Sequence, residues 1–223
     1  MITPGSELLI KILFILILGT AFMIIMQKSL ASLFSIYGVQ SFCLAVISFV
    51  LFQQNGSFIL LALGIITIIT KVIIIPYMLN KVRLESGLKR DAEFRYLTPV
   101  SSILVGIALI FVVYNSFYRL FQLSQDSLFF LGAVIGVSLT LMGMLVIFSR
   151  KKVVTKVVGY LMMENGILLF SIFMAELPFI IELLILVDLI IFILLSTVLA
   201  FGIESTEEDF SRKLNRFTDW FKK

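Results

Sequence analysis

The chain has 223 residues, of which 60% are apolar and 14% charged, and its formal net charge is +4. A soluble domain carries about a quarter charged residues, so this composition indicates an integral membrane protein whose positive balance belongs to cytoplasmic loops, not to nucleic-acid binding. The sequence has no histidine and one cysteine, Cys43, which excludes histidine-ligated metals, Ser-His-Asp or Cys-His nucleophiles, an intrachain disulfide and a four-cysteine cluster within this chain.

Seven apolar stretches are each long enough to cross a bilayer, which needs about 20 residues per helix. We expect an all-α integral membrane fold, with a polytopic membrane domain over residues 1–201 and a cytoplasmic tail over 202–223. The predicted spans are 8–27, 30–52, 57–79, 99–121, 128–149, 153–175 and 179–201.

Basic residues gather in alternate connections between these spans. The segments 80–98 and 150–156 and the tail are rich in Lys and Arg, whereas 53–56 is uncharged and 122–127 carries only Asp126. The positive-inside rule therefore predicts an N-terminus outside and a C-terminus in the cytoplasm. We expect a multi-pass protein of the cell inner membrane, with the lipid bilayer as its solvent and no nucleic-acid partner.

Glu164 is the most informative residue, because it lies deep in the sixth span and has no Lys or Arg within one helical turn. Desolvation favours the neutral form of a carboxyl group, and a carboxyl that exchanges its proton is what a proton relay requires. The alternative is a permanently protonated Glu164 that donates to a carbonyl of a neighbouring helix. Asn165 follows directly and is a possible member of the same site.

The seventh span contains Asp188 near its middle, with apolar neighbours on both sides. A charge at that depth must meet another helix, so Asp188 is a second candidate for a proton path. Glu182 is a weaker candidate, since it lies on a different helical face from Asp188. Glu182 and Glu176 could equally be interfacial.

Lys71 lies inside the third span, five residues before Pro76. Two interpretations are open: the ammonium snorkels to the cytoplasmic interface, or it pairs with Glu164 or Asp188. Pro76 lacks an N–H and frees a backbone carbonyl near Lys71, which is tolerated where the backbone is buried in protein or lines a wet cavity. Gln40 is a further polar residue, inside the second span.

Two other segments have recognisable patterns. Small residues recur on the fifth span and predict a face that another helix can approach closely; they are Gly132, Gly136, Thr140 and Gly143. In the tail, Ser205 and Glu208 have capping-box spacing. Apolar residues then recur at helical spacing, which predicts an amphipathic helix that lies on the cytoplasmic interface or docks a partner; they are Phe210, Leu214, Phe217 and Phe221.

The sequence GYLMMENGI at 159–167, supported by ELPFIIELLILVD at 176–188, resembles hydrogenase-4 component E, a membrane subunit of group 4 [NiFe]-hydrogenase and formate hydrogenlyase-type complexes. That family is similar, over its last three spans, to the K subunit of complex I and the C subunit of Mrp-type antiporters. In the K subunit two membrane glutamates form part of a polar axis for protons. Glu164 falls on the first position, and Asp188 is the nearest candidate for the second, at a shorter spacing than the family pattern.

The resemblance implies a non-redox membrane subunit of a hydrogenase- or complex I-like respiratory assembly, not catalytic alone. Its partners would be antiporter-like membrane subunits and a hydrogenase- or quinone-reductase-like arm. No cofactor is expected in this chain, and the Ni-Fe and iron–sulfur centres would lie on partner subunits. Two alternatives remain: a free-standing small secondary ion transporter with Lys71 and Asp188 as its ion site, or a purely structural anchor. The residues do not distinguish H+ from Na+.

Overall fold

The computed structural model describes residues 4–85, 98–120, 127–174, 190, 191 and 193. Within these ranges the chain is almost entirely helical and contains no strand. Six of its helical stretches are long and apolar enough to cross a membrane. Helices satisfy their own backbone hydrogen bonds, which a bilayer requires, so the described part has the architecture of a multi-pass membrane protein.

Six predicted spans correspond to helices whose ends differ from the predicted ends by a few residues. The helices are α1 (Pro4–Met26), α2 (Leu30–Asn55), α3 (Phe58–Thr67), the π-helical segment η1 (Ile68–Ile74), α4 (Ile75–Glu85), α5 (Pro99–Leu120), α6 (Ser127–Ser149) and α7 (Val153–Met174). The third span comprises α3, η1 and the start of α4. The predicted seventh span, except for three of its residues, and the predicted tail helix lie outside the described residues.

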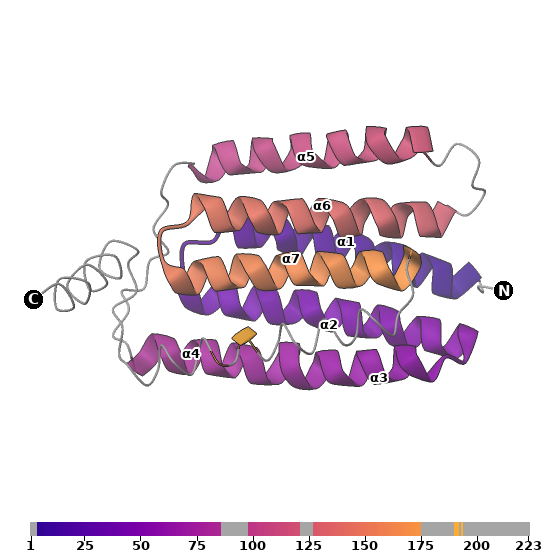
Figure 1. Cartoon of the computed structure of the whole chain (residues 1–223), viewed down its shortest axis with the longest axis horizontal. Coiled ribbons are helices and arrows are strands. Elements are labelled where there is room, and N and C mark those ends of the chain that lie inside the picture. Colours follow the sequence, from indigo (N-terminus) through magenta and orange to yellow (C-terminus); the bar gives the residue numbers. More distant parts are fainter. Residues whose placement is uncertain (1–3, 86–97, 121–126, 175–189, 192, 194–223) are drawn as a thin grey trace, which may run out of the picture.

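The helices lie alongside one another, with α5 at one edge of the bundle and α3–α4 at the other (Figure 1). Between these edges are α1, α2, α6 and α7, and the contact between α6 and α7 is the most extensive. One end of the bundle, at which α1, α4 and α6 finish, carries most of the described basic residues that do not lie in the middle of a helix. These are Lys28, Lys81, Arg83, Arg150, Lys151, Lys152 and Lys156.

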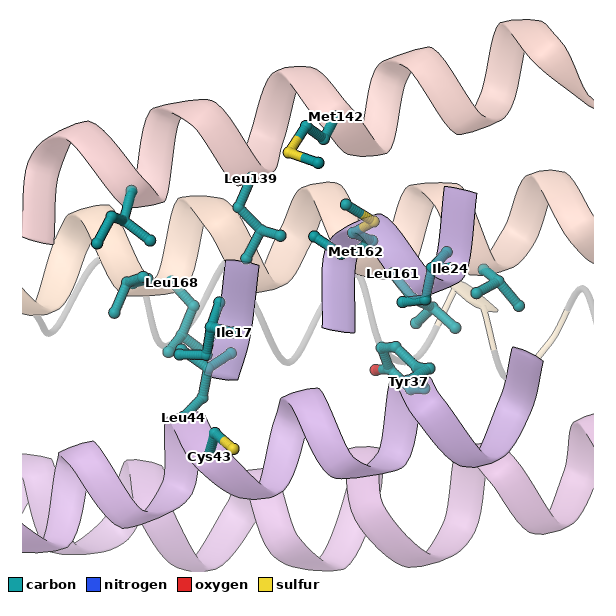
Figure 2. Close-up of a cluster of buried hydrophobic side chains, with 14 of the residues drawn as sticks. Ile17, Ile24, Tyr37, Cys43, Leu44, Leu139, Met142, Leu161, Met162 and Leu168 are labelled. Carbon is teal, nitrogen blue, oxygen red and sulfur yellow. The ribbon is translucent and has the colours of Figure 1, made fainter. Parts of the chain in front are cut away.

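The centre of the bundle is an apolar core shared by α1, α2, α6 and α7. Figure 2 shows Ile17 of α1, Leu44 of α2 and Leu168 of α7 gathered between these helices, with Leu139 of α6 above them. All four side chains are fully buried. The side chains of this core are apolar and offer neither donors nor acceptors. A polar group at this depth can therefore bond only to other polar groups of the protein.

Glycines bring the backbones of α6 and α7 into direct contact. A Cβ atom added at Gly136 would lie 2.6 Å from the backbone nitrogen of Phe170, and one at Gly143 would lie 2.5 Å from that of Met163. From the other side, a Cβ at Gly166 would meet the backbone nitrogen of Thr140. The close approach fixes the rotation of α7, and with it the direction in which residues 164 and 165 point.

The third span changes its helical register around Lys71. The N–H of Ile75 donates to the carbonyl of Thr70, five residues earlier, instead of to that of Lys71. Pro76 follows and has no N–H to offer. The Lys71 carbonyl thus lacks both of its helical donors, which matches the expectation that Pro76 frees a carbonyl nearby. The helix continues through Pro76 as α4, because the wider π turn absorbs the missing hydrogen bond.

Arg150, between α6 and α7, closes the C-terminal end of α1. Its side chain is fully buried, and Nη2 donates to the carbonyls of Ile24, Ile25 and Gln27 at 3.0, 2.9 and 2.8 Å. The last carbonyls of a helix have no partners within it and attract a cation. Desolvation lowers the pKa of Arg150 to about 10, so the guanidinium stays charged at neutral pH.

Candidate functional site, a buried polar network

Lys71 and Glu164 form an ion pair in the middle of the bundle. Nζ of Lys71 lies 2.8 Å from Oε1 of Glu164, and the side chains are 0% and 7% exposed. Glu164 is thus one of the two partners expected for Lys71. The alternative in which the lysine snorkels to the interface is wrong, because its side chain points into the protein and has no contact with solvent.

Asn165 extends this pair toward α2. Its Oδ1 accepts from Nζ of Lys71 at 3.3 Å, so that Lys71 bonds two successive residues of α7. Its Nδ2 donates to Oγ of Ser41 at 3.0 Å and to Oε1 of Gln40 at 3.4 Å. An amide has both a donor and an acceptor end, which allows Asn165 to join the charged pair to the uncharged side chains of α2.

Gln40 carries the network on to α1. Its Nε2 donates to Oγ1 of Thr20 at 3.3 Å and to the carbonyl of Ile17 at 3.4 Å. Thr20 in turn donates to the same carbonyl at 2.8 Å. Four helical segments, α1, α2, η1 and α7, are therefore joined across the bundle by one continuous series of polar contacts.

The seam between α6 and α7 positions this site. Thr140 of α6 donates to the carbonyl of Gly136 at 2.9 Å and approaches the carbonyl of Met163 at 3.5 Å. Met163 immediately precedes Glu164, so α6 contacts α7 on one side while Glu164 and Asn165 face η1 and α2 on the other. Glycines on the seam permit this arrangement, since any larger residue would push α7 away.

A buried ion pair of this kind is costly to form, and its members depend on each other. Desolvation of two charges removes most of the gain from their attraction, whereas loss of one partner leaves an uncompensated charge. Hydrogen bonds from neighbouring polar groups reduce the cost. Asn165 supplies one such bond to Lys71. The neighbouring polar groups thus stabilise the ion pair, and a charge added nearby would change its stability.

The other predicted site residues have different outcomes. Asp188 and Glu182 lie outside the described residues, and their predicted roles stay predictions. Gly132 lies against the ring of Phe173 rather than against the backbone of α7. Among the described residues, no group of three or more His, Cys, Asp and Glu could hold a metal ion.

Sequence reasoning missed Ser41 and Thr20, which complete the network on α2 and α1. A hydroxyl in an apolar span is common, because it can bond the carbonyl one turn earlier in its own helix. Neither residue therefore stands out by type. For Ser41 the sequence did contain a signal, because this residue directly follows Gln40, which was a candidate. For Thr20 only the packing of α1 on α2 reveals the contact.

Comparison with known proteins identifies no relative of this chain. No family model matches it, no curated protein matches it, and no solved structure matches it.

Proposed function

We propose that the chain is a non-redox membrane subunit that contributes a proton path to a larger respiratory assembly of the hydrogenase or complex I type. The observation that carries the proton path is the buried pair of Lys71 and Glu164, 2.8 Å apart, continued by Asn165 to Gln40. Charges at this depth are costly and usually functional. The assembly is inferred from the resemblance of residues 159–188 to hydrogenase-4 component E.

The chemistry of the site suits reversible proton uptake. Glu164 is stabilised as a carboxylate by the ammonium of Lys71, and a proton bound to the carboxylate would abolish that attraction. A positive charge arriving nearby would favour proton release, and a negative charge would favour uptake.

The direction of the network supports transfer in the plane of the membrane. Lys71, Glu164 and Gln40 lie near the middles of their helices, and the contacts run from η1 through α7 and α2 to α1. A path of this kind would link antiporter-like subunits beside the chain to a redox arm elsewhere in the assembly. In this proposal the redox centres belong to the partners, and the N-terminus lies outside the cell.

The first test identifies the assembly. The tagged chain is isolated in a mild detergent, and the proteins that accompany it are identified by mass spectrometry. The proposal expects antiporter-like membrane subunits together with a hydrogenase-like or quinone-reductase-like arm. Recovery of the chain alone, with ion transport by that purified chain in liposomes, would show a free-standing transporter and overturn the proposed assembly.

The second test addresses the proton path in the isolated assembly. Glu164→Gln keeps the size of the side chain and removes its ability to carry a proton. We expect at least a tenfold loss of proton pumping at unchanged subunit composition. The matched control is Glu7→Gln, because Glu7 is partly exposed and pairs with Lys11 within α1. Full pumping by an assembled Glu164→Gln variant would show that the pair is only structural.

A further inference from the structure

Thr67 is a buried hydroxyl without a hydrogen-bond partner, one turn before Lys71. Its side chain is fully buried, and its Oγ1 atom has no partner. Threonine in a helix usually bonds the carbonyl one turn earlier. Thr70 on the same span does so, with its Oγ1 2.9 Å from the carbonyl of Ile66. Thr67 departs from this behaviour.

Ser102 and Ser138 are also buried hydroxyls without a partner, but neither shares a helix with an ionisable residue of the network. Thr67 precedes Lys71 by four residues, which places both on one face of the span. Both are fully buried, so this face is turned into the protein. A long side chain on a helix leans toward the helix N-terminus, and for Lys71 that is the direction of Thr67.

The ammonium of Lys71 has a donor to spare. It carries three N–H groups, and the structure gives it an ion pair with Glu164 Oε1 at 2.8 Å and one hydrogen bond, to Asn165 Oδ1 at 3.3 Å. An unmade hydrogen bond on a buried charge is expensive. Lys71 thus has an unused donor, and Thr67, one turn away on the same span, has an unused acceptor.

We propose that Thr67 is an alternative acceptor of the Lys71 ammonium, used in place of Glu164 when Glu164 is protonated. This inference rests on the proposed proton path and adds a residue to it. A proton delivered from water binds the Glu164 carboxylate and forms a neutral carboxyl group, and the N–H bonds of Lys71 stay intact. The ammonium then loses its counter-charge and turns toward Thr67 Oγ1. When Glu164 releases the proton, the ammonium returns.

The consequence is a cation that moves toward the Phe58 end of the span. Within the described residues packed against Glu164, α2 contributes Tyr37 and Cys43, and α6 contributes no ionisable group. Glu164 is therefore the only carboxyl of the described core whose protonation can release Lys71. Thr67 is a positioning residue: it holds the ammonium away from Glu164 and keeps the proton on the carboxyl.

Thermal unfolding of the full-length chain in detergent tests the contact without reference to transport. Cys43 is the only cysteine and is buried, so a thiol-reactive fluorescent dye reports unfolding directly. Thr67→Val replaces the hydroxyl by a methyl group of similar size. We measure its effect in the wild-type chain and in Glu164→Gln, whose uncharged side chain represents protonated Glu164.

In the wild-type chain Thr67→Val should leave the unfolding midpoint unchanged or raise it, because the substitution removes a buried hydroxyl that has no partner there. In the Glu164→Gln chain it should lower the midpoint by about 5 °C, the value expected for loss of a hydrogen bond to a buried charge in a chain of this size. Thr67→Ser should retain most of the stability. The matched control, Thr70→Val, should give the same shift in both backgrounds.

Equal effects of Thr67→Val in the two backgrounds, or no effect in either, would overturn the proposal. If Glu164→Gln does not fold, the same comparison is made in Glu164→Met, which also removes the counter-charge of Lys71. Equal effects of Thr67→Val in that chain and in the wild-type chain would also overturn the proposal. The unfolding result does not depend on proton pumping. If Glu164→Gln leaves pumping by the assembly unchanged, the proton path is refuted, and the unfolding midpoints still decide separately whether Thr67 contacts Lys71.

Discussion

Lys71 of η1 and Glu164 of α7 form an ion pair of 2.8 Å that the described helices screen from solvent. The pair lies in a core whose other side chains are largely apolar. It is therefore the point at which a small change in charge has its largest effect on both stability and proton binding.

Removal of one member of this pair should cost more than removal of both. Lys71→Met alone and Glu164→Met alone each leave an unpaired ionisable group, and we expect a loss of about 3 kcal/mol for each. The double substitution replaces the pair by two apolar side chains and should recover at least half of that loss. Dye binding to Cys43 on heating gives the midpoints. Additive effects of the two single substitutions would contradict a direct pair.

Asn165→Leu should disconnect the charged pair from α2. The substitution keeps the approximate size of the side chain but removes the bonds to Lys71, Ser41 and Gln40. We expect a loss of about 2 kcal/mol, because several buried polar groups lose a partner, and a reduced pumping rate of the isolated assembly. Asn115→Leu is the control, since Asn115 is exposed and bonds only its own helix. Equal losses for the two variants would mean that the network is unimportant.

Gly136→Ala should separate α6 from α7. The added Cβ would lie 2.6 Å from the backbone nitrogen of Phe170, and a backbone cannot yield as a flexible side chain can. We expect destabilisation by about 2 kcal/mol or more. Gly19→Ala is the matched control in α1, where nothing lies within 4 Å of the added atom. It should stabilise the chain by about 0.5 kcal/mol, from the higher helix propensity of alanine. Similar values for both variants would refute the close backbone contact.

Arg150→Met should uncap α1. The carbonyls of Ile24, Ile25 and Gln27 would lose their donor in a buried environment, at a cost of about 3 kcal/mol in total. Arg150→Lys should recover only part of this, because an ammonium is more strongly hydrated than a guanidinium and is costlier to bury. Lys151→Met, at the half-buried neighbouring position, is the control and should be nearly neutral. The readout is again the midpoint of thiol exposure.

Much of the fold could be predicted from the sequence, for a simple reason. Six spans correspond to helices because a bilayer demands long apolar segments, and Gly136 and Gly143 mark a close helix contact because only small residues allow one. The pairing of Lys71 could be narrowed to two carboxyls by depth alone. Its choice of Glu164 depends on how η1, α2 and α7 pack, which local pattern does not encode.

The missed features share a physical origin. The π turn at Lys71 lies just before Pro76, whose ring lies near Gly38 of α2, whereas a proline in a sequence also predicts a kink or a break. The hydroxyls of Thr20, Ser41 and Thr67 look alike in the sequence. Only their neighbours show that two of them join the network and that the third is left without a partner.

The contact of Arg150 with α1 also bears on biogenesis. The donor to the carbonyl of Gln27 lies 123 residues further along the chain, after four more of the six helices long enough to span the membrane. Domains and their parts form as the chain emerges from the ribosome, N-terminal part first. The end of α1 therefore acquires its buried donor only after α6 has been synthesised, so the packing of α1 is completed late in the formation of the bundle.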